Sequence, residues 1–176
     1  LAVTGVIALV LGLILLVWAG VFGNVPDKKE LAEIKNPIAS EVYGADSVLL
    51  GRYFLQERSP ATAEELPENL KQALIATEDV RFYDHHGVDI KSLFRVMIKT
   101  IMLQRESSGG GSTLTQQLAK NVYPRKTHSL LSLPINKIKE FIIAWRLEQV
   151  YKKDQILLLY LNTIPFSDNT YGIKTA

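Results

Sequence analysis

The first 26 residues of the chain carry no charged side chain, and this constrains the fold more than any other feature. Within them, Val3 to Phe22 is a run of about twenty mostly apolar residues, which as a helix can cross a bilayer core of roughly 30 Å. A cleaved signal peptide is the alternative, but its apolar region usually spans about 7 to 15 residues and follows a basic leader. The sequence therefore predicts a transmembrane anchor over residues 1–23, a linker over residues 24–39 and one domain over residues 40–176.

Length and composition limit the remaining possibilities. A hydrophobic content of 47% over 176 residues supplies a sizeable core, and the lack of cysteine excludes disulfides and thiolate metal sites. The chain begins with Leu1 inside the apolar run and ends at Ala176 without a charged tail. We therefore expect an excerpt of a longer protein, truncated at its C-terminal end within the fold.

The charged residues are sorted along the chain, although the formal net charge is only +2. Residues 24–90 hold 7 Lys or Arg and 13 Asp or Glu, whereas residues 91–139 hold 9 Lys or Arg against Glu106 alone. A basic segment of this kind suits a polyanionic ligand or an anionic lipid surface. Solvated helix faces explain the charge bias equally well when it is taken by itself.

Hydrophobic patterns and turn signals predict a mainly α domain with a small β-hairpin. Two short runs rich in Val, Tyr, Leu and Phe flank Gly44-Ala45-Asp46 and predict the hairpin strands, over residues 40–43 and 48–54. Helical periodicity, proline in first turns and capping residues predict the helices. The expected helix starts lie near Leu66, Asp89, Ser112 or Thr113, Pro134, and Lys153 or Asp154.

A carboxylate pair, Glu78 and Asp79, ends the first helix of the predicted domain. The negative pole of that helix and the neighbouring carboxylate both favour a raised pKa for Glu78, and a carboxylate placed in this way could act as a general base near neutral pH. A solvated pair at a helix end explains the same residues, and position alone favours that explanation. Asp79 is expected to cap or hold the turn over residues 82–85.

His85 and His86 follow shortly and raise the question of a metal site. Adjacent histidines seldom face one ion, and the next histidine is His128. We therefore expect His85 to be a structural, hydrogen-bonded histidine, with Gly87 in a left-handed turn.

Two further segments combine polar groups with helix ends. Gly109 to Gln117 lacks the lysine of a P-loop, but its backbone N–H groups, hydroxyls and helix N-terminus can together bind an anion or a sugar. Lys137 and Glu140 are three residues apart on one predicted helix and are therefore neighbours on one face. A connecting loop and a surface ion pair are the simpler explanations, and an active-site carboxylate with a phosphate-binding lysine is the alternative.

Taken in order, these segments resemble the peptidoglycan glycosyltransferase (transglycosylase) domain of class A penicillin-binding proteins and monofunctional transglycosylases. Four motifs carry the resemblance: Glu78-Asp79-x-x-Phe82-Tyr83-x-His85-x-Gly87, Gly111-Ser112-Thr113-Leu114-Thr115-Gln116-Gln117 followed by Lys120-Asn121, Lys137-x-x-Glu140, and Lys153-x-x-Ile156-Leu157-x-x-Tyr160-Leu161-Asn162. Three residues depart from the family pattern, because Asn136 replaces a basic residue, Leu158 a Glu and Ser167 a Gly. Arg125 or Lys126 can replace the charge that Asn136 removes.

The resemblance implies a lysozyme-like helical fold and an inverting transferase. Such an enzyme polymerises lipid II into β-1,4-linked glycan strands, releases undecaprenyl pyrophosphate, and acts on the extracytoplasmic side of the bacterial cytoplasmic (inner) membrane as a single-pass protein. Glu78 is implied as the base for the acceptor hydroxyl, and Glu140 as a donor-side residue with a divalent cation, Mg²⁺ or Mn²⁺, as its candidate ligand. The implied substrate-binding residues are Arg95, Ser112, Thr113, Gln116, Gln117, Lys120 and Lys137.

The expected partners are lipid II, the growing glycan strand, the membrane and other cell-wall synthesis proteins, and nucleic acid is not among them. A lysozyme-like or lytic glycan-cleaving enzyme is the alternative, because it would use similar carboxylates. A catalytically silent scaffold is a third hypothesis. The lysine-rich segment and the predicted anchor argue against the glycan-cleaving enzyme.

Overall fold

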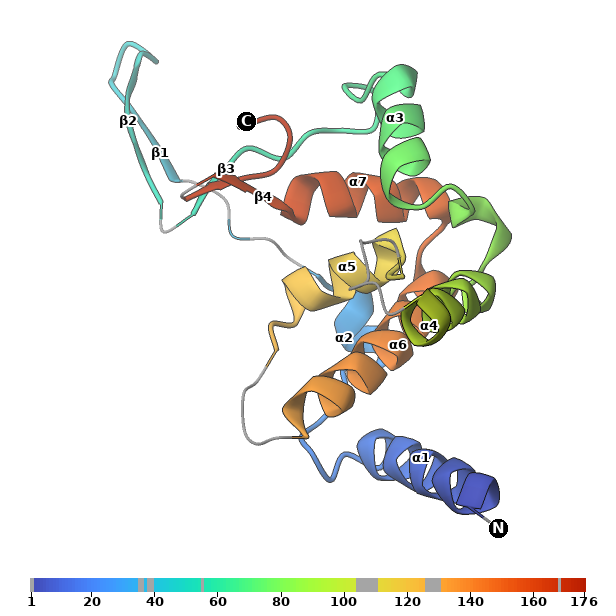
Figure 1. The fold of residues 1–176 in the computed structure, drawn as a ribbon. Coiled ribbons are helices and arrows are strands. Elements are labelled where there is room, and N and C mark those ends of the chain that lie inside the picture. The colour runs from blue at the N-terminus through green and yellow to red at the C-terminus, as the bar shows by residue number, and fades with distance from the viewer. Residues whose placement is uncertain are drawn as a thin grey trace.

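A computed structural model describes residues 2–34, 37, 40–54, 56–103, 111–125, 131–167 and 169–176. Helices form most of the described structure, as the sequence predicted (Figure 1). The helices are α1 (Ala2–Trp18), α2 (Lys28–Ala32), α3 (Glu68–Glu78), α4 (Ile90–Leu103), α5 (Leu114–Val122), α6 (Ser132–Val150) and α7 (Lys153–Thr163), with a 3₁₀ turn over Phe82–Asp84. The strands are β1 (Ser40–Tyr43), β2 (Leu49–Tyr53), β3 (Glu57–Arg58), β4 (Pro165–Ser167) and β5 (Thr170–Tyr171).

The strands β1 and β2 form the predicted hairpin, which extends away from the helices at the upper left of Figure 1. They are antiparallel, with Ser40 opposite Tyr53. The Val48 N–H donates to Asp46 Oδ1 at 3.2 Å, which closes the turn in the way that Asp favours. All four residues of β1 are exposed, so the hairpin adds little to the hydrophobic core.

A second, three-stranded sheet has the order β3-β5-β4 and was not predicted. The strand β3 is parallel to β5, and β4 is antiparallel to β5. Its strands have only two or three residues each, too few for a period-two pattern to stand out in the sequence. The sheet joins the segment before α3 to the segment after α7.

The hydrophobic core lies where α5, α6 and α7 pack together. The α5 residues Leu114, Leu118 and Ala119 recur at helical spacing and are fully buried. Burial of each leucine contributes about 1.5–3 kcal/mol to stability, so these side chains fix α5 in the core. Other fully buried core residues are Leu31, Phe82, Leu147, Ile156 and Leu157.

Two predicted helix starts are confirmed by their capping hydrogen bonds, and a third is shifted. The Oγ1 of Thr113 accepts from the Gln116 N–H at 3.2 Å and caps α5. Asp89 caps α4 in the same way, through the Ser92 N–H at 3.1 Å. Helix α6 begins at Ser132 rather than at Pro134. Pro134 then lies in the first turn, where a missing N–H breaks no hydrogen bond of the helix.

The N-terminal helix is shorter than the apolar run from which the transmembrane anchor was predicted. Helix α1 has 17 residues and ends at Trp18, where a turn with Gly20 at a φ of 82° replaces the expected continuation to Phe22. Across the parts of the chain that the structure describes, no helix combines the length and the apolar character needed to span a membrane.

The segment between α1 and α2 is fastened to α6 by two basic side chains. Lys139 Nζ donates to the Phe22 carbonyl oxygen at 2.6 Å. Arg146 Nη1 donates to the carbonyl oxygens of Val25, at 3.1 Å, and Pro26, at 2.6 Å. These hydrogen bonds from charged donors fix the segment against the helix that carries the Lys137–Glu140 pair.

Candidate active site

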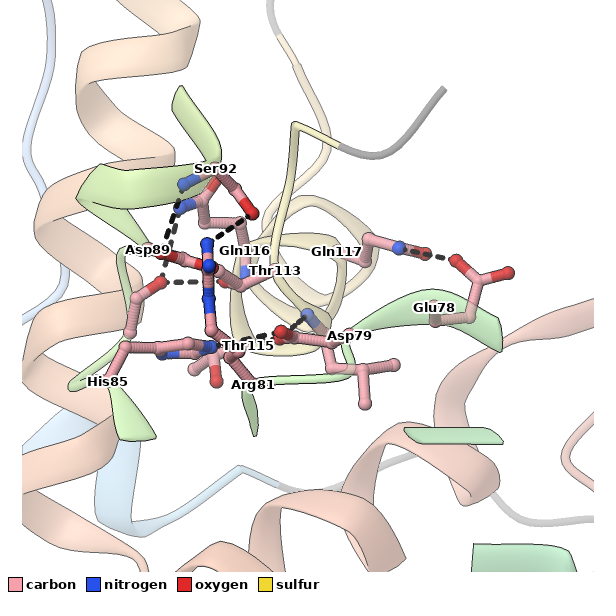
Figure 2. A network of polar contacts seen from close by, with 12 residues as sticks. Glu78, Asp79, Arg81, His85, Asp89, Ser92, Thr113, Thr115, Gln116 and Gln117 are labelled. Carbon is pink, nitrogen blue, oxygen red and sulfur yellow. Dashed lines mark hydrogen bonds and ion pairs between the residues drawn. The ribbon is translucent and has the colours of Figure 1, made fainter. Parts of the chain in front are cut away.

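The carboxylate of Glu78 is exposed at the C-terminal end of α3. Gln117 Nε2 donates to Glu78 Oε2 at 2.9 Å, a contact visible at the right of Figure 2. The Tyr160 hydroxyl in turn donates to Gln117 Oε1 at 3.0 Å. Side chains of α3, α5 and α7 are thereby connected, and Glu78 is oriented while it stays accessible to solvent.

The neighbouring carboxylate, Asp79, points into the protein instead (Figure 2). Asp79 is 8% exposed, its Oδ2 lies 3.0 Å from His85 Nε2, and the same oxygen accepts the Leu114 N–H at 3.0 Å. The Leu114 N–H opens α5, so the carboxylate also meets the positive end of that helix. His85 is thus the hydrogen-bonded, buried histidine that the sequence predicted, and Asp79 holds its turn.

A second buried carboxylate, Glu148 of α6, was not singled out from the sequence. Its side chain is 4% exposed, and its oxygens accept from Lys153 Nζ at 2.7 Å and from the Thr115 hydroxyl at 2.7 Å. Its Oε1 lies 4.0 Å from His85 Nδ1. The available signal was spacing, because Glu148 follows Glu140 by about two helical turns on the same face. The buried polar cluster, as we call it, comprises Asp79, His85, Thr115, Glu148 and Lys153.

Gly87 joins the turn after α3 to both α5 and α6. Its φ of +85° confirms the predicted left-handed turn, and a Cβ atom there would lie 2.7 Å from the backbone of Ala144. The Thr113 hydroxyl and Gln116 Nε2 both donate to the Gly87 carbonyl oxygen, at 2.7 and 3.2 Å. Both side chains are buried, so they also fasten the turn against α5.

Arg81 organises the start of α4, although the sequence did not single it out. Its Nη2 donates to Asp89 Oδ2 at 2.7 Å and to Ser92 Oγ at 2.9 Å. Burial alone would raise the pKa of Asp89, but the hydrogen bonds from Arg81 and Ser92 outweigh it and lower the pKa to about 2. Arg95 Nη2 donates to the same Ser92 oxygen at 3.1 Å, which places a second guanidinium beside the first.

The predicted pair on α6 forms the basic side of the site. Lys137 Nζ donates to Glu140 Oε2 at 3.1 Å, to Gln116 Oε1 at 3.2 Å and to Ser112 Oγ at 2.8 Å. Arg125 Nε donates to the other Glu140 oxygen at 2.7 Å, and this bond raises the pKa of Arg125. Glu140 is only 5% exposed, so two cations compensate one buried carboxylate.

A cavity of about 390 Å³ brings several of the predicted site residues together. Glu78, Arg95, Ser112 and Thr113 line it, along with Arg81 and Asp89. Lys120 lies one turn beyond Gln116 on α5 and lines a different cavity, so the structure does not bring it to this one. Gly109 and Gly110 of the predicted loop lie outside the described residues. The site rim, as we call it, comprises Glu78, Arg95, Ser112, Gln117 and Lys137.

The residues around Glu140 do not fit a cation held by protein ligands alone. Both oxygens of Glu140 already accept from basic groups, and a metal ion would have to displace Arg125 or Lys137. Within the described ranges, no three Asp, Glu or His side chains gather where they could hold a metal ion. Carboxylates are the ligands that Mg²⁺ prefers, and Glu140 supplies only one.

Two of the departures from the family pattern now have a physical account. Asn136 is buried, and the charge that it lacks is supplied at Glu140 by Arg125, one of the two residues expected to replace it. Leu158 packs partly buried against the hydrophobic core, so it contributes apolar contact where the pattern has a carboxylate. Ser167 ends β4, where it lies opposite Thr170 of β5.

Comparison with known proteins places these residues in a family. Residues 46–176 match the family model described as Transglycosylase. The chain is 39% identical over 153 residues to penicillin-binding protein 1A of Escherichia coli (strain K12), covering 87% of the chain and 17% of that protein. It is 44% identical over 123 residues to penicillin-binding protein 1F of Bacillus subtilis (strain 168), covering 70% and 16%. It is 37% identical over 171 residues to penicillin-binding protein 1A of Aquifex aeolicus (strain VF5), covering 97% and 23%.

The chain spans about a fifth of the length of these relatives. The family match covers β2, α3 to α7 and both sides of the candidate site. The chain therefore belongs to the transglycosylase family, the peptidoglycan glycosyltransferase domains of class A penicillin-binding proteins.

Proposed function

We propose that the whole protein polymerises lipid II into β-1,4-linked glycan strands and releases undecaprenyl pyrophosphate, with inversion at the anomeric carbon. The observation that carries the proposal is that an accessible carboxylate, Glu78, lines the same cavity as Ser112, which contacts the basic residue Lys137. Ser112 links the two sides, because it lines the cavity and accepts from Lys137 at 2.8 Å. Glycosyl transfer with a pyrophosphate leaving group needs such a base and such positive charge.

On the acceptor side, Glu78 takes the proton of the GlcNAc 4-hydroxyl. The oxygen of that hydroxyl then forms a bond to C1 of the MurNAc of the donor strand, and the bond between C1 and the pyrophosphate oxygen breaks. The leaving group departs with that electron pair. Glu78 suits the role because it is exposed and because Gln117 holds one of its oxygens.

On the donor side, Lys137 and Arg125 supply positive charge to the leaving pyrophosphate. Glu140 positions both of them through its two oxygens. Arg95 lies on the cavity that Glu78 lines and can contact phosphate or sugar oxygens there. No step is assigned to a divalent cation, because both oxygens of Glu140 already accept from basic groups.

The location and the partners follow from the substrate. Lipid II is held in the membrane by its undecaprenyl chain, so the domain would act at the extracytoplasmic surface of the cytoplasmic membrane. The growing strand and other cell-wall synthesis proteins are the partners that this role requires. A glycan-cleaving enzyme is not favoured, because the family match is to transglycosylases.

The test is polymerisation of fluorescent lipid II by the full-length protein, followed by gel analysis of the strands. Glu78→Gln keeps the shape of the side chain and removes the base, so we expect the rate to fall about 10³-fold. Glu68→Gln, at the exposed N-terminal end of the same helix, is the matched control and should keep the wild-type rate. A wild-type rate in Glu78→Gln would remove the proposed base.

A further inference from the structure

A chain of two hydrogen bonds runs from a buried tyrosine to the proposed base. Tyr160 of α7 donates to Gln117 Oε1 at 3.0 Å, and Gln117 Nε2 donates to Glu78 Oε2 at 2.9 Å. Each residue belongs to a different helix, and the contacts span the sequence from residue 78 to residue 160. The proposed reaction uses Glu78, but the chemistry described above gives Tyr160 no task.

The chemistry of the three groups fixes the direction of the chain. An ionised carboxylate can only accept hydrogen bonds, so the side of the Gln117 amide that faces Glu78 must be the NH₂ group. The carbonyl oxygen of the amide then faces Tyr160, and the hydroxyl must donate to it. The reversed amide would place Oε1 against Glu78 Oε2, with two acceptors in contact.

Tyr160 is suited to hold that direction permanently. It is 6% exposed and packs in the hydrophobic core, which fixes its ring. Burial, together with the negative charge of Glu78, raises the pKa of Tyr160 to about 12. The hydroxyl therefore stays protonated and remains a donor throughout the neutral range.

We propose that Tyr160 is a positioning residue that acts on Glu78 through Gln117, an inference that rests on the proposed role of Glu78 as the base. By fixing the Gln117 amide, Tyr160 keeps a donor on Glu78 Oε2. The other oxygen, Oε1, is thereby left for the proton of the acceptor hydroxyl. A base held in one orientation reacts from one geometry rather than from several.

Loss of the tyrosine hydroxyl leaves the Gln117 amide free to turn over. The ionised form of Glu78 then loses its donor for part of the time and binds a proton more readily. We expect Tyr160→Phe in the full-length protein to lower kcat about tenfold, with KM for lipid II nearly unchanged. The acid limb of the kcat profile should move to higher pH by about one unit.

Tyr151→Phe is the matched control. The Tyr151 hydroxyl also makes one hydrogen bond from a partly buried position, to the Leu31 carbonyl oxygen at 2.8 Å, and has no link to Glu78. Tyr151→Phe should lower the free energy of unfolding as much as Tyr160→Phe does, without moving the pH profile of kcat. Thermal unfolding of both variants measures this shared cost.

The double variant tests the route through Gln117. In a Gln117→Ala background, Tyr160→Phe should cause no further fall in kcat, because the residue that carries the effect is already absent. Gln117→Ala alone should move the acid limb by the same amount as Tyr160→Phe. Gln117 is partly exposed, so this variant keeps the measurement available even if Tyr160→Phe unfolds.

The outcomes separate this inference from the proposed function. A wild-type kcat and pH profile in Tyr160→Phe, or an unmoved profile in Gln117→Ala, would overturn the positioning role while Glu78→Gln still abolished polymerisation. A further tenfold fall in the double variant would overturn the route through Gln117. A wild-type rate in Glu78→Gln would instead remove the role of Glu78 as the base, and a wild-type protein that did not polymerise lipid II would remove the proposed function itself.

Discussion

The two carboxylates that end α3 differ in their surroundings, and the regions around them differ in the same way. On the site rim, Glu78 is exposed, and Lys137 has a side chain that is 30% exposed. In the buried polar cluster, the side chains of Asp79 and Glu148 are 5% and 4% exposed. Two adjacent residues of one motif can therefore have different roles: Glu78 serves the proposed chemistry, and Asp79 stabilises the fold. Substitutions on the rim should cost activity, and those in the cluster should cost folding.

The largest effect on stability is expected from Glu148→Gln. Removing this charge leaves Lys153, whose side chain is 20% exposed, without its carboxylate partner and weakens the contact with Thr115. We expect the free energy of unfolding to fall by about 3 kcal/mol, measured by urea denaturation. Glu68→Gln breaks the exposed Lys71–Glu68 pair and should cost less than about 0.5 kcal/mol. Equal losses in the two variants would contradict the distinction between cluster and surface.

On the rim, Lys137→Met should cost activity instead. The methionine keeps most of the side-chain volume, and Glu140 retains Arg125, so unfolding should change little. Loss of one positive donor to the leaving group should slow polymerisation about a hundredfold. Lys91→Met removes an exposed charge from α4 and is the control for overall charge. If Lys91→Met slowed polymerisation as much as Lys137→Met, the result would contradict a specific role for Lys137.

Asp89 should show a smaller effect, which depends on pH. Its pKa in the folded protein, about 2, lies below the ordinary value of 3.8, so the ionised carboxylate stabilises the fold above about pH 4. This contribution, about 2 kcal/mol, is lost as the pH falls from about 4 towards 2. Asp89→Asn keeps a cap for α4 and removes the charge. The difference in unfolding free energy between wild type and variant should shrink over that range, and a constant difference would contradict the assignment.

The helical elements could be predicted because local patterns determine them, whereas Arg95 and Gln117 were assigned to a site only through the family resemblance. Thr113 and Asp89 were recognisable as caps, and Lys137 and Glu140 as neighbours on one face, from spacing alone. Gly87 was recognisable as a turn residue because a positive φ favours glycine.

Within the buried polar cluster, Asp79 and His85 were predicted as structural residues, but the contacts among Thr115, Glu148 and Lys153 could not be predicted from local patterns. Thr115 and Glu148 are 33 residues apart in sequence, and Arg81 contacts Asp89 across a turn whose path is set by packing. The β3–β5 pairing likewise joins residues far apart in the chain. The end of α1 at Trp18 was missed because hydropathy continues past the residue where the backbone turns at Gly20.

The hydrogen bonds of Lys139 and Arg146 to the carbonyl oxygens of residues 22–26 have a mechanical consequence. Three carbonyl oxygens of this connection are held by side chains of α6, so we expect the connection to move together with α6. Lys139 lies two residues from Lys137 on α6. A disturbance of this connection is therefore expected to reach the helix that carries Lys137.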